Sequence, residues 1–339
     1  MFKKILAKIF EKIAEYRNKK YNKTPNLIRC NVPVISIGNL SVGGTGKTPF
    51  VQMLSKYFIS RNLKIGIVGR GYKRKTKGEI IVSDGKNILA DADEAGDEML
   101  LLANSLKIPI IADDDKSKAA KSMEQKFAPD LIIVDDGFQH RKLYRDIDIV
   151  LLDRDTIENP KLLPEGRLRE PLSSVQRADV IVLTGSIELS NELKELVSNQ
   201  IIIKVKQIKA NPYYLNGKEP NFNSLNTYRK GIFAFAGIAR PDRFYDMLAE
   251  MDYKIINKKS YDDHHHYTKG DIENLIKIAK ENNLSVLATT EKDAVKLIKF
   301  IDDFENEKIK VLVFPIALTI FEGKDQFFKF LNKMFPKKN

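Results

Sequence analysis

The feature that most limits what this chain can fold into is a glycine-rich turn between a predicted strand and a predicted helix. Residues 34–38 (Val-Ile-Ser-Ile-Gly) are mostly apolar, residues 41–48 read Ser-Val-Gly-Gly-Thr-Gly-Lys-Thr, and a helical pattern runs from Pro49 to about Arg61. Pro49 suits the first turn of a helix, where a missing N–H costs no hydrogen bond. A strand, a glycine-rich turn and a helix in this order are the context of a phosphate-binding loop, with an ordinary strand-to-helix turn as the alternative.

Each residue type in this turn suits the binding of a nucleotide. Glycines let backbone N–H groups close around phosphate oxygens, Lys47 can reach the β- and γ-phosphates, and the hydroxyl of Thr48 can ligate Mg²⁺. The usual motif begins with glycine where this chain has Ser41, and the additional glycines compensate in part. The predicted nucleotide-binding residues are Gly43, Gly44, Thr45, Gly46, Lys47 and Thr48.

Two carboxylates follow another apolar run. Residues 131–134 (Leu-Ile-Ile-Val) predict a buried strand, and Asp135 and Asp136 come directly after it. In α/β proteins, ligands bind at the carboxyl ends of the strands. Adjacent acids after a strand often form only a turn, but beside a phosphate loop Asp135 and Asp136 are candidates to bind Mg²⁺ together with Thr48.

Strand and helix patterns alternate along most of the chain. Before residue 200, further strands are predicted at 64–68, 108–111, 147–152 and 180–183, and helices at 94–106 and 116–127. Later strands are predicted at 232–236, 286–290 and 311–314. The alternation predicts an α/β fold resembling a P-loop NTPase, with a doubly wound, mainly parallel sheet and a second, smaller α/β domain.

Changes in the strand and helix patterns along the sequence also predict domain boundaries. We expect residues 24–200 to form the nucleotide-binding domain and residues 201–225 an extended linker, either plain or folded as a hairpin. Residues 226–339 are expected to form the smaller domain, which closes the active-site cleft.

Composition excludes several classes of protein. The chain has 339 residues, of which 43% are hydrophobic, and this content rules out a disordered chain. The single cysteine, Cys30, cannot form an internal disulfide, which argues against a small secreted scaffold. No run approaches the roughly 18 apolar residues that a membrane span needs.

Residues 1–23 carry half of the formal net charge of +12, because seven lysines and Arg17 outnumber two glutamates by six. Apolar residues recur there at three- and four-residue intervals, as on one face of a helix: Phe2, Ile5, Leu6, Ile9, Phe10 and Ile13. We predict an amphipathic helix on a membrane surface, with a helix docked on the protein's own core as the alternative. We expect no nucleic-acid partner, since the lysines are not interleaved with stacking aromatic residues.

The four histidines are not scattered. His140 follows the acids at 135–136, and His264, His265 and His266 are consecutive after Asp263. Consecutive side chains point in different directions, which disfavours a tetrahedral zinc site. The tandem histidines are therefore either a solvated helix cap or include one proton-transfer residue that a carboxylate orients.

Taken together, these segments resemble the lipid A 4'-kinases, the tetraacyldisaccharide 4'-kinases of Gram-negative bacteria. The resemblance runs along nearly the whole chain, through segments 38–49, 70–72, 96–98, 135–140, 168–171, 236–239, 263–265 and 290–293. Two positions depart from the family pattern: Met99 stands where proline is frequent, and Tyr261 where phenylalanine is common. Neither change removes an assigned chemical group.

The resemblance implies an activity and its partners. The activity is ATP-dependent phosphorylation of the 4'-hydroxyl of tetraacyldisaccharide 1-phosphate, a lipid A precursor, to form lipid IVA, with ATP and Mg²⁺ as cofactors. The implied partners are this acylated lipid and, through residues 1–23, a membrane surface. The implied location is peripheral, on the cytoplasmic face of the inner membrane, and no obligate protein partner is inferred.

The resemblance also implies residue roles. Asp97 is similar in motif position to the family's proposed base, His264 is similar to its partner, and Lys47 acts on the phosphates. A sugar hydroxyl is a poor nucleophile, so a carboxylate within hydrogen-bond reach would help it to attack the γ-phosphoryl group. The implied metal ligands are Thr48, Asp135, Asp136 and Glu170.

Three other classes of protein share part of this pattern. A membrane-associated switch ATPase of the deviant-loop type also combines a glycine-rich loop with an amphipathic helix, but its signature lysine is replaced here by Val42. A soluble small-metabolite kinase would give residues 1–23 no role. A pure lipid-binding module would need neither Lys47 nor Asp97.

Overall fold

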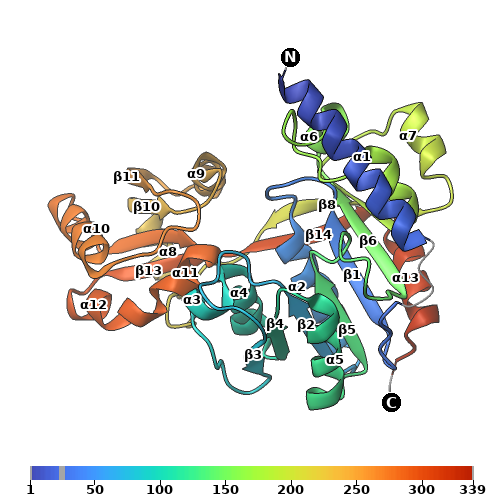
Figure 1. The fold of residues 1–339 in the computed structure, drawn as a ribbon. Helices are drawn as coiled ribbons and strands as arrows, with labels where there is room; N and C mark the ends of the chain where they lie inside the picture. The colour runs from blue at the N-terminus through green and yellow to red at the C-terminus, as the bar shows by residue number, and fades with distance from the viewer. Residues whose placement is uncertain (1, 23–26, 338–339) are drawn as a thin grey trace. The chain divides into compact units, whose positions relative to one another are not determined.

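The computed structural model describes residues 2–22 and 27–337. The chain divides into two compact units, one formed by Met1–Gln207 with Leu318–Asn339 and the other by Ile208–Ala317. Each unit has a mainly parallel sheet with helices (Figure 1). The predicted α/β fold class is therefore confirmed.

The described residues of the first unit contain a nine-stranded sheet in the order β14-β8-β7-β6-β1-β5-β2-β4-β3. The pairs from β8 to β4 are parallel, and β3 is antiparallel to β4. The strands are β1 (Val34–Asn39), β2 (Ile65–Gly69), β3 (Ile80–Asp84), β4 (Pro109–Ala112), β5 (Leu131–Asp135), β6 (Ile147–Leu152), β7 (Val180–Thr184), β8 (Ile201–Lys209) and β14 (Ile316–Glu322).

The helices of this unit are α1 (Phe2–Asn22), α2 (Lys47–Ile59), α3 (Ala92–Ala95), α4 (Asp97–Leu106), α5 (Lys116–Phe127), α6 (Arg154–Glu158), α7 (Asn191–Leu196) and α13 (Lys324–Met334), with a 3₁₀ helix, η1, at Leu172–Arg177. The helix predicted at 94–106 is interrupted at Gly96, between α3 and α4.

Alternating side chains of the central strands build a core on each face of this sheet. Leu131 and Ile133 of β5 pack with residues of α2, whereas Ile132 and Val134 pack with residues of α5. Burial on both faces explains why residues 131–134 of β5 are continuously apolar. Because β5 and β1 are parallel neighbours, their carboxyl ends lie side by side, with Ile37 opposite Asp135.

The second unit contains a five-stranded sheet among its described residues, in the order β11-β10-β12-β13-β9, with only β9 antiparallel to its neighbour. Its strands are β9 (Tyr213–Tyr214), β10 (Ile232–Ala236), β11 (Ile255–Ser260), β12 (Val286–Thr290) and β13 (Lys310–Phe314). Its helices are α8 (Phe222–Arg229), α9 (Pro241–Glu250), α10 (Lys269–Glu281), α11 (Glu291–Leu297) and α12 (Ile301–Asn306), with a 3₁₀ helix, η2, at Ile298–Phe300.

The segment predicted as a linker at 201–225 is divided between the two sheets. Strand β8 pairs with β7 in the first unit, and β9 pairs with β13 in the second, so these two extended segments do not form a hairpin with each other.

Strand β14 pairs with β8 in the nine-stranded sheet, and helix α13 belongs to the first unit, although both were predicted within the smaller domain. The reason is aromatic packing on α2, where the rings of Phe328 and Tyr57 have centroids 4.3 Å apart and those of Phe327 and Phe50 are 6.4 Å apart. Such a contact joins segments more than 270 residues apart, which a periodic pattern does not reveal.

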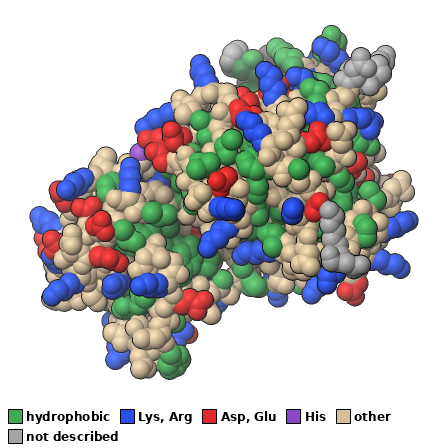
Figure 2. Space-filling view, turned by 90° about the horizontal axis from the view of Figure 1, so that it is seen from below, with side chains coloured by type: hydrophobic (Ala, Val, Ile, Leu, Met, Phe, Trp, Pro, Cys, Tyr) green, Lys and Arg blue, Asp and Glu red, His purple; other side chains and the backbone are tan. Residues whose placement is uncertain are grey.

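Helix α1 spans the segment that was predicted to be amphipathic. Within residues 2–22 and 27–337, no helix combines the length and the apolar character required to traverse a bilayer. On the face shown in Figure 2, Lys and Arg side chains are interspersed with Asp and Glu side chains.

Candidate active site

The phosphate loop connects β1 to α2 and ends at the N-terminus of α2. Gly46 has a φ of 87° and immediately precedes Lys47, the first residue of α2, and no side chain caps this helix. The free N–H groups of an uncapped first turn, together with the helix dipole, favour an anion. Thr48 lies in this first turn and is half-buried.

The outer part of the loop is held by Arg167. Its guanidinium donates to the carbonyl of Val42 at 2.8 and 3.0 Å, and the N–H of Val42 donates to the carbonyl of Arg167 at 2.8 Å. Gly43 has a φ of 104°, and a Cβ there would lie 2.6 Å from this guanidinium. Both observations explain the glycine at 43, while Gly44 is exposed with open space around it.

Ser41 stands where the usual motif has glycine, and it points into the protein. Its side chain is buried, and its hydroxyl forms a hydrogen bond of 3.0 Å with the hydroxyl of Thr156. The serine therefore anchors the start of the loop and leaves the glycines to shape the rest.

Asn39, the last residue of β1, connects the loop with its lysine. Its side-chain N–H donates to the buried hydroxyl of Thr45 at 2.9 Å, and its Oδ1 accepts from Nζ of Lys47 at 3.2 Å. Nζ of Lys47 also lies 3.5 Å from Oδ1 of Asp136. The sequence did not single out Asn39, because its importance arises from contacts across the turn.

Arg169 neutralises Asp136 with two hydrogen bonds. The two guanidinium nitrogens donate to the two carboxylate oxygens at 2.9 and 2.8 Å, and Arg169 also contacts Asn39. Although burial opposes ionisation, the hydrogen bonds from Arg169 and the charge of Lys47 hold the pKa of Asp136 far below its ordinary value. Asp136 is thus an anion with both oxygens engaged.

Asp135 has the opposite character. It is buried at the end of β5, and its Oδ1 accepts no hydrogen bond within the described part of the chain. Burial, followed by the negative charges of Glu98 and Asp136, raises the pKa of Asp135 to about 7. A buried carboxylate oxygen without a partner is a place where a cation would lower the free energy.

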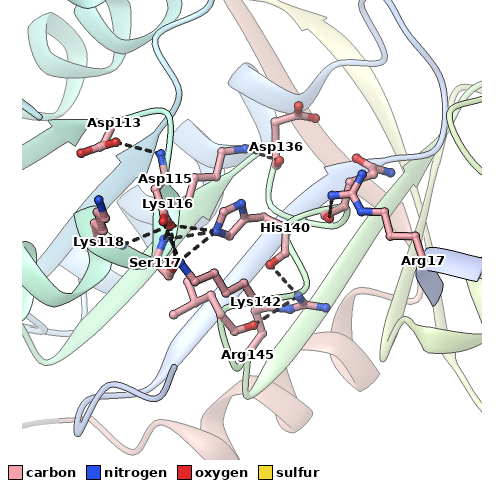
Figure 3. Close-up of polar contacts among 12 residues, drawn as sticks. Arg17, Asp113, Asp115, Lys116, Ser117, Lys118, Asp136, His140, Lys142 and Arg145 are labelled. Carbon is pink, nitrogen blue, oxygen red and sulfur yellow. Dashed lines mark hydrogen bonds and ion pairs between the residues drawn. The ribbon is translucent and has the colours of Figure 1, made fainter. Parts of the chain in front are cut away.

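The segment that follows Asp136 contacts the start of α5 through Lys116 and His140 (Figure 3). Lys116 is buried and donates to the carbonyl of Asp136. His140 lies at the N-terminus of α5, where its Nε2 accepts from the N–H of Ser117 at 3.3 Å. Burial and then the charge of Lys116 lower the pKa of His140 to about 4, so this histidine is a neutral hydrogen-bond acceptor at pH 7.

Asp97 is the first residue of α4 and is 5% exposed. Gly96 before it has a φ of 80°, and a Cβ at Gly96 would meet the backbone of Tyr72 at 2.8 Å and that of Gly71 at 2.9 Å. Two segments that carried the resemblance, 70–72 and 96–98, are therefore in direct backbone contact. This contact places Asp97 at the N-terminus of α4.

Glu170 faces the N-terminal helix. Its Oε2 forms an ion pair of 2.8 Å with Arg177 and accepts from the side chain of Asn18 at 3.1 Å. Arg17 of the same helix donates to the carbonyl of Gln139 at 3.1 Å. Helix α1 is therefore attached to the two loops, at 139 and 170, that flank the phosphate site.

In the second unit, three motif segments meet at the carboxyl edge of the parallel strands β11, β10 and β12. The N–H of His264 donates to the carbonyl of Gly237 at 3.1 Å, and the N–H of Gly237 donates to the fully buried Asp293 at 3.0 Å. Lys292 lies 2.9 Å from Asp263 and 3.1 Å from Nε2 of His264.

The three consecutive histidines have three different environments. His264 contacts Lys292, whereas His265 stacks on Tyr261 with ring centroids 4.4 Å apart, and His266 is exposed. Among the described residues, no three His, Cys, Asp or Glu side chains gather as a set that could hold a metal ion.

Comparison with known proteins decides the family. The family model for tetraacyldisaccharide-1-P 4'-kinase matches residues 2–336. The chain belongs to this family.

Relatives of the same name cover most of the chain. The tetraacyldisaccharide 4'-kinase of Chlorobium phaeovibrioides is 39% identical over 306 residues, covering 86% of this chain and 85% of the relative. That of Halothermothrix orenii is 36% identical over 345 residues, covering 93% and 88%. The crystal structure of LpxK from Aquifex aeolicus in complex with ATP superposes with a TM-score of 0.81 at 31% identity, covering 97% of each chain.

Membership of the family confirms the predicted enzyme class, a 4'-kinase of lipid A biosynthesis. Within the first unit, the structure brings together the phosphate loop, Lys47, Asp135 and Asp136. The catalytic roles of Asp97 and His264 and the ligation of a metal by Glu170 stay predictions. Site residues that sequence reasoning did not select are Asn39, Lys116, Arg167 and Arg169.

Proposed function

We propose that this enzyme transfers the γ-phosphoryl group of ATP to the 4'-hydroxyl of tetraacyldisaccharide 1-phosphate and so forms lipid IVA. The observation that carries the proposal is the uncapped N-terminus of α2 behind a glycine loop, with Lys47 beside Asp136, in a chain of this kinase family. The relative from Aquifex aeolicus was crystallised in complex with ATP, which supports ATP as the phosphoryl donor.

The phosphates would bind to the backbone N–H groups of residues 43–48. Lys47 would then exchange its contacts with Asn39 and Asp136 for the β- and γ-phosphates, as the corresponding lysine of a phosphate loop does. Arg169 keeps the charge of Asp136 balanced during that exchange, because its two hydrogen bonds to the carboxylate do not involve Lys47.

The side chains around the loop fit a magnesium ion. Asp135 offers a buried oxygen without a hydrogen-bond partner, and Thr48 offers a hydroxyl in the first turn of α2. Asp136 and Glu170, the other predicted ligands, are engaged by Arg169 and Arg177. When bound, Mg²⁺ neutralises charge on the β- and γ-phosphates. We therefore propose Asp135 as the principal protein carboxylate at the metal.

Asp97 would take the proton of the 4'-hydroxyl as its oxygen attacks the γ-phosphorus. Asp97 is the first residue of α4, and a carboxylate within hydrogen-bond reach of a hydroxyl can serve as its general base. We assign His264 the role of orienting this carboxylate. The closing of the active-site cleft by the second unit stays a prediction.

Helix α1 would hold the enzyme peripherally on the cytoplasmic face of the inner membrane, where the acylated substrate lies. Ile9, Ile13 and Tyr16 are 50%, 60% and 73% exposed, and Lys8 and Lys12 beside them are exposed as well. Exposed apolar side chains flanked by lysines suit the boundary of an anionic bilayer. Ala7 and Ala14 on another face are buried, so the helix is docked and amphipathic at once.

The decisive experiment incubates the purified protein with ATP, Mg²⁺ and tetraacyldisaccharide 1-phosphate and follows the lipid by mass spectrometry. We expect the mass of one added phosphate, located at the 4'-position. Lys47→Ala should lower kcat by about 100-fold or more, because it removes a cation that stabilises the developing charge. Lys56→Ala, an exposed lysine on the same helix, serves as the matched control and should retain activity.

Asp97→Asn separates chemistry from nucleotide binding. We expect kcat to fall by about 100-fold or more while the KM for ATP changes little, because the amide keeps the shape but cannot accept the proton. A loss of ATP affinity at unchanged kcat would contradict the role of Asp97. Hydrolysis of ATP without any phosphorylated lipid would instead favour a switch ATPase.

A further inference from the structure

The contact between Lys292 and His264 is not used by the function proposed above, although both residues lie in segments that carried the resemblance. Lys292 is the second residue of α11, and its Nζ lies 3.1 Å from Nε2 of His264. The side chain of His264 is 9% exposed, so this edge of its ring is largely shielded from water. What the lysine does to the ring follows from the hydrogen-bonding chemistry of the two groups.

An ammonium group has three N–H donors and no lone pair to offer. A ring nitrogen 3.1 Å from it can form a hydrogen bond only as the acceptor, so Nε2 must carry the lone pair. In a neutral imidazole the proton is then on Nδ1. The competing arrangement, with a proton on Nε2 directed at Oδ2 of Asp263, spans 3.7 Å, which is too long for a hydrogen bond.

Asp263 strengthens this preference by holding the lysine. Its Oδ1 accepts from Nζ of Lys292 at 2.9 Å, so one carboxylate fixes the cation that faces the ring. By itself an ion pair between two partly exposed side chains contributes little to stability. The ion pair matters here because it holds the ammonium group of Lys292 in position against the ring of His264.

Hydrogen bonds hold the backbone beneath the two side chains. His264 has a φ of 66°, in the left-handed region, and its N–H is bonded to Gly237. A Cβ at Gly237 would lie 3.0 Å from the carboxylate of Asp293 and 3.1 Å from His265, so a larger residue would crowd both side chains. Asp293 follows Lys292 in α11 and accepts from the N–H of Gly237. The turn that bears His264 and the helix that bears Lys292 are thus joined through one buried residue.

We infer that Lys292 is a positioning residue that holds His264 as the tautomer with its proton on Nδ1. This inference rests on the function proposed above, in which His264 orients the carboxylate of Asp97. A carboxylate accepts hydrogen bonds, and the tautomer set by Lys292 leaves the ring's only N–H on Nδ1 as the donor. Lys292 therefore acts on the reaction through His264 and without contact to the reacting atoms.

The tautomer can be measured directly in the full-length protein without substrate. The chain has four histidines, so long-range ¹H–¹⁵N spectra of the ¹⁵N-labelled protein are simple, and the spectrum of His264→Gln assigns His264. At pH 8 we expect a protonated Nδ1 and an unprotonated Nε2 for His264. Lys292→Met, which keeps the length and removes the donor, should convert the ring wholly or partly to the Nε2–H form. Lys292→Arg, which keeps a donor, should restore the original pattern.

Kinetics of the same variants provides the second readout. We expect Lys292→Met to lower kcat by about 10-fold or more at nearly unchanged KM for ATP, because fewer molecules carry the productive tautomer. Lys292→Arg should recover much of this loss. Lys299→Met, an exposed lysine of the same unit, is the matched control and should behave as the wild type.

The outcomes separate this inference from the proposed function. An unchanged His264 tautomer in a folded Lys292→Met protein would overturn the inference, whatever happens to activity. If His264→Gln leaves kcat unchanged, the orienting role in the proposed function is wrong, and with it the catalytic consequence of Lys292. If His264→Gln lowers kcat and Lys292→Met changes both the tautomer and kcat, both are supported.

Discussion

Two neighbouring carboxylates at the end of β5 acquire opposite proton affinities from their surroundings. Asp136 receives two hydrogen bonds from Arg169 and stays ionised, whereas Asp135 is buried beside Asp136 and the charge of Glu98, which raises its pKa to about 7. The difference suits the site proposed above, which would balance the charge of a triphosphate and a divalent cation. Identical residue types in consecutive positions can therefore perform different tasks.

The lowered pKa of His140 predicts a pH dependence of protein stability. Burial, followed by the charge of Lys116, lowers its pKa from 6.5 to about 4, while Asp115 at 3.4 Å and Arg145 are its other charged neighbours. Between these two pH values the unfolded chain takes up a proton that the folded chain does not, so the free energy of unfolding decreases as pH falls. The expected loss is on the order of 3 kcal/mol by pH 4.

The measurement compares denaturant unfolding of the wild type and His140→Gln between pH 7.5 and 4.5. Glutamine keeps a hydrogen-bond acceptor for Ser117 but does not titrate. Other titrating groups are common to both proteins, so the difference between the two curves isolates His140. Parallel curves would show that His140 has no such proton linkage.

At the scale of secondary-structure elements, the break between α3 and α4 positions Asp97. A continuous helix over 94–106 would make Asp97 its fourth residue, whereas the turn at Gly96 makes it the first residue of α4. The close approach of Gly96 to the backbone of Gly71 explains why the chain turns at this point.

Gly96→Ala tests this contact, and Gly78→Ala is its matched control. Both glycines have a positive φ, 80° at Gly96, where ψ is 150°, and 74° at Gly78, so both substitutions strain the backbone, by about 1–3 kcal/mol. Only at Gly96 would the new Cβ also collide with backbone atoms, which should add about 1–3 kcal/mol. We expect denaturant unfolding to show this difference and kcat to fall only in Gly96→Ala. Equal destabilisation by the two substitutions would mean that the loop at 71–72 shifts to accommodate the new methyl group, and would contradict the importance of this contact.

At the scale of the whole molecule, α1 has one face that packs on the protein and another that is exposed. Ala7 and Ala14 are buried, and Asn18 reaches Glu170, whereas Ile9 and Ile13 are exposed. Docked and membrane-bound helices are therefore not alternatives here, because small residues provide the protein contact and large apolar ones remain outside. This arrangement allows the proposed membrane-binding face of α1 to be tested without removing the helix.

Replacing Ile9 and Ile13 together by Gln should weaken binding to anionic vesicles at least about 10-fold, because burial of two such side chains contributes more than about 1.4 kcal/mol. The fold and the activity toward detergent-dispersed substrate should be retained. Ile298→Gln changes a comparably exposed isoleucine of the second unit and is the control. Sedimentation with vesicles at low and high salt provides the measurement, and unchanged partitioning would contradict a membrane role for α1.

The sequence by itself determined the features that depend on residues close together in the chain. The strand, glycine turn and helix around Lys47 are local, as is the apolar run before Asp135, and the structure places them as the patterns predict. Alternation of strands and helices was enough for the fold class, since a parallel sheet buried on both faces requires apolar strands joined by helices.

Only the tertiary structure decided the features that join distant segments. Asn39, Lys116 and Arg169 meet around Asp136 because the ends of parallel strands converge, and no local pattern marks such residues. The return of α13 to the first unit likewise depends on aromatic packing with α2. Periodicity shows which face of an element is apolar, but the partner for that face is selected by packing of the whole chain.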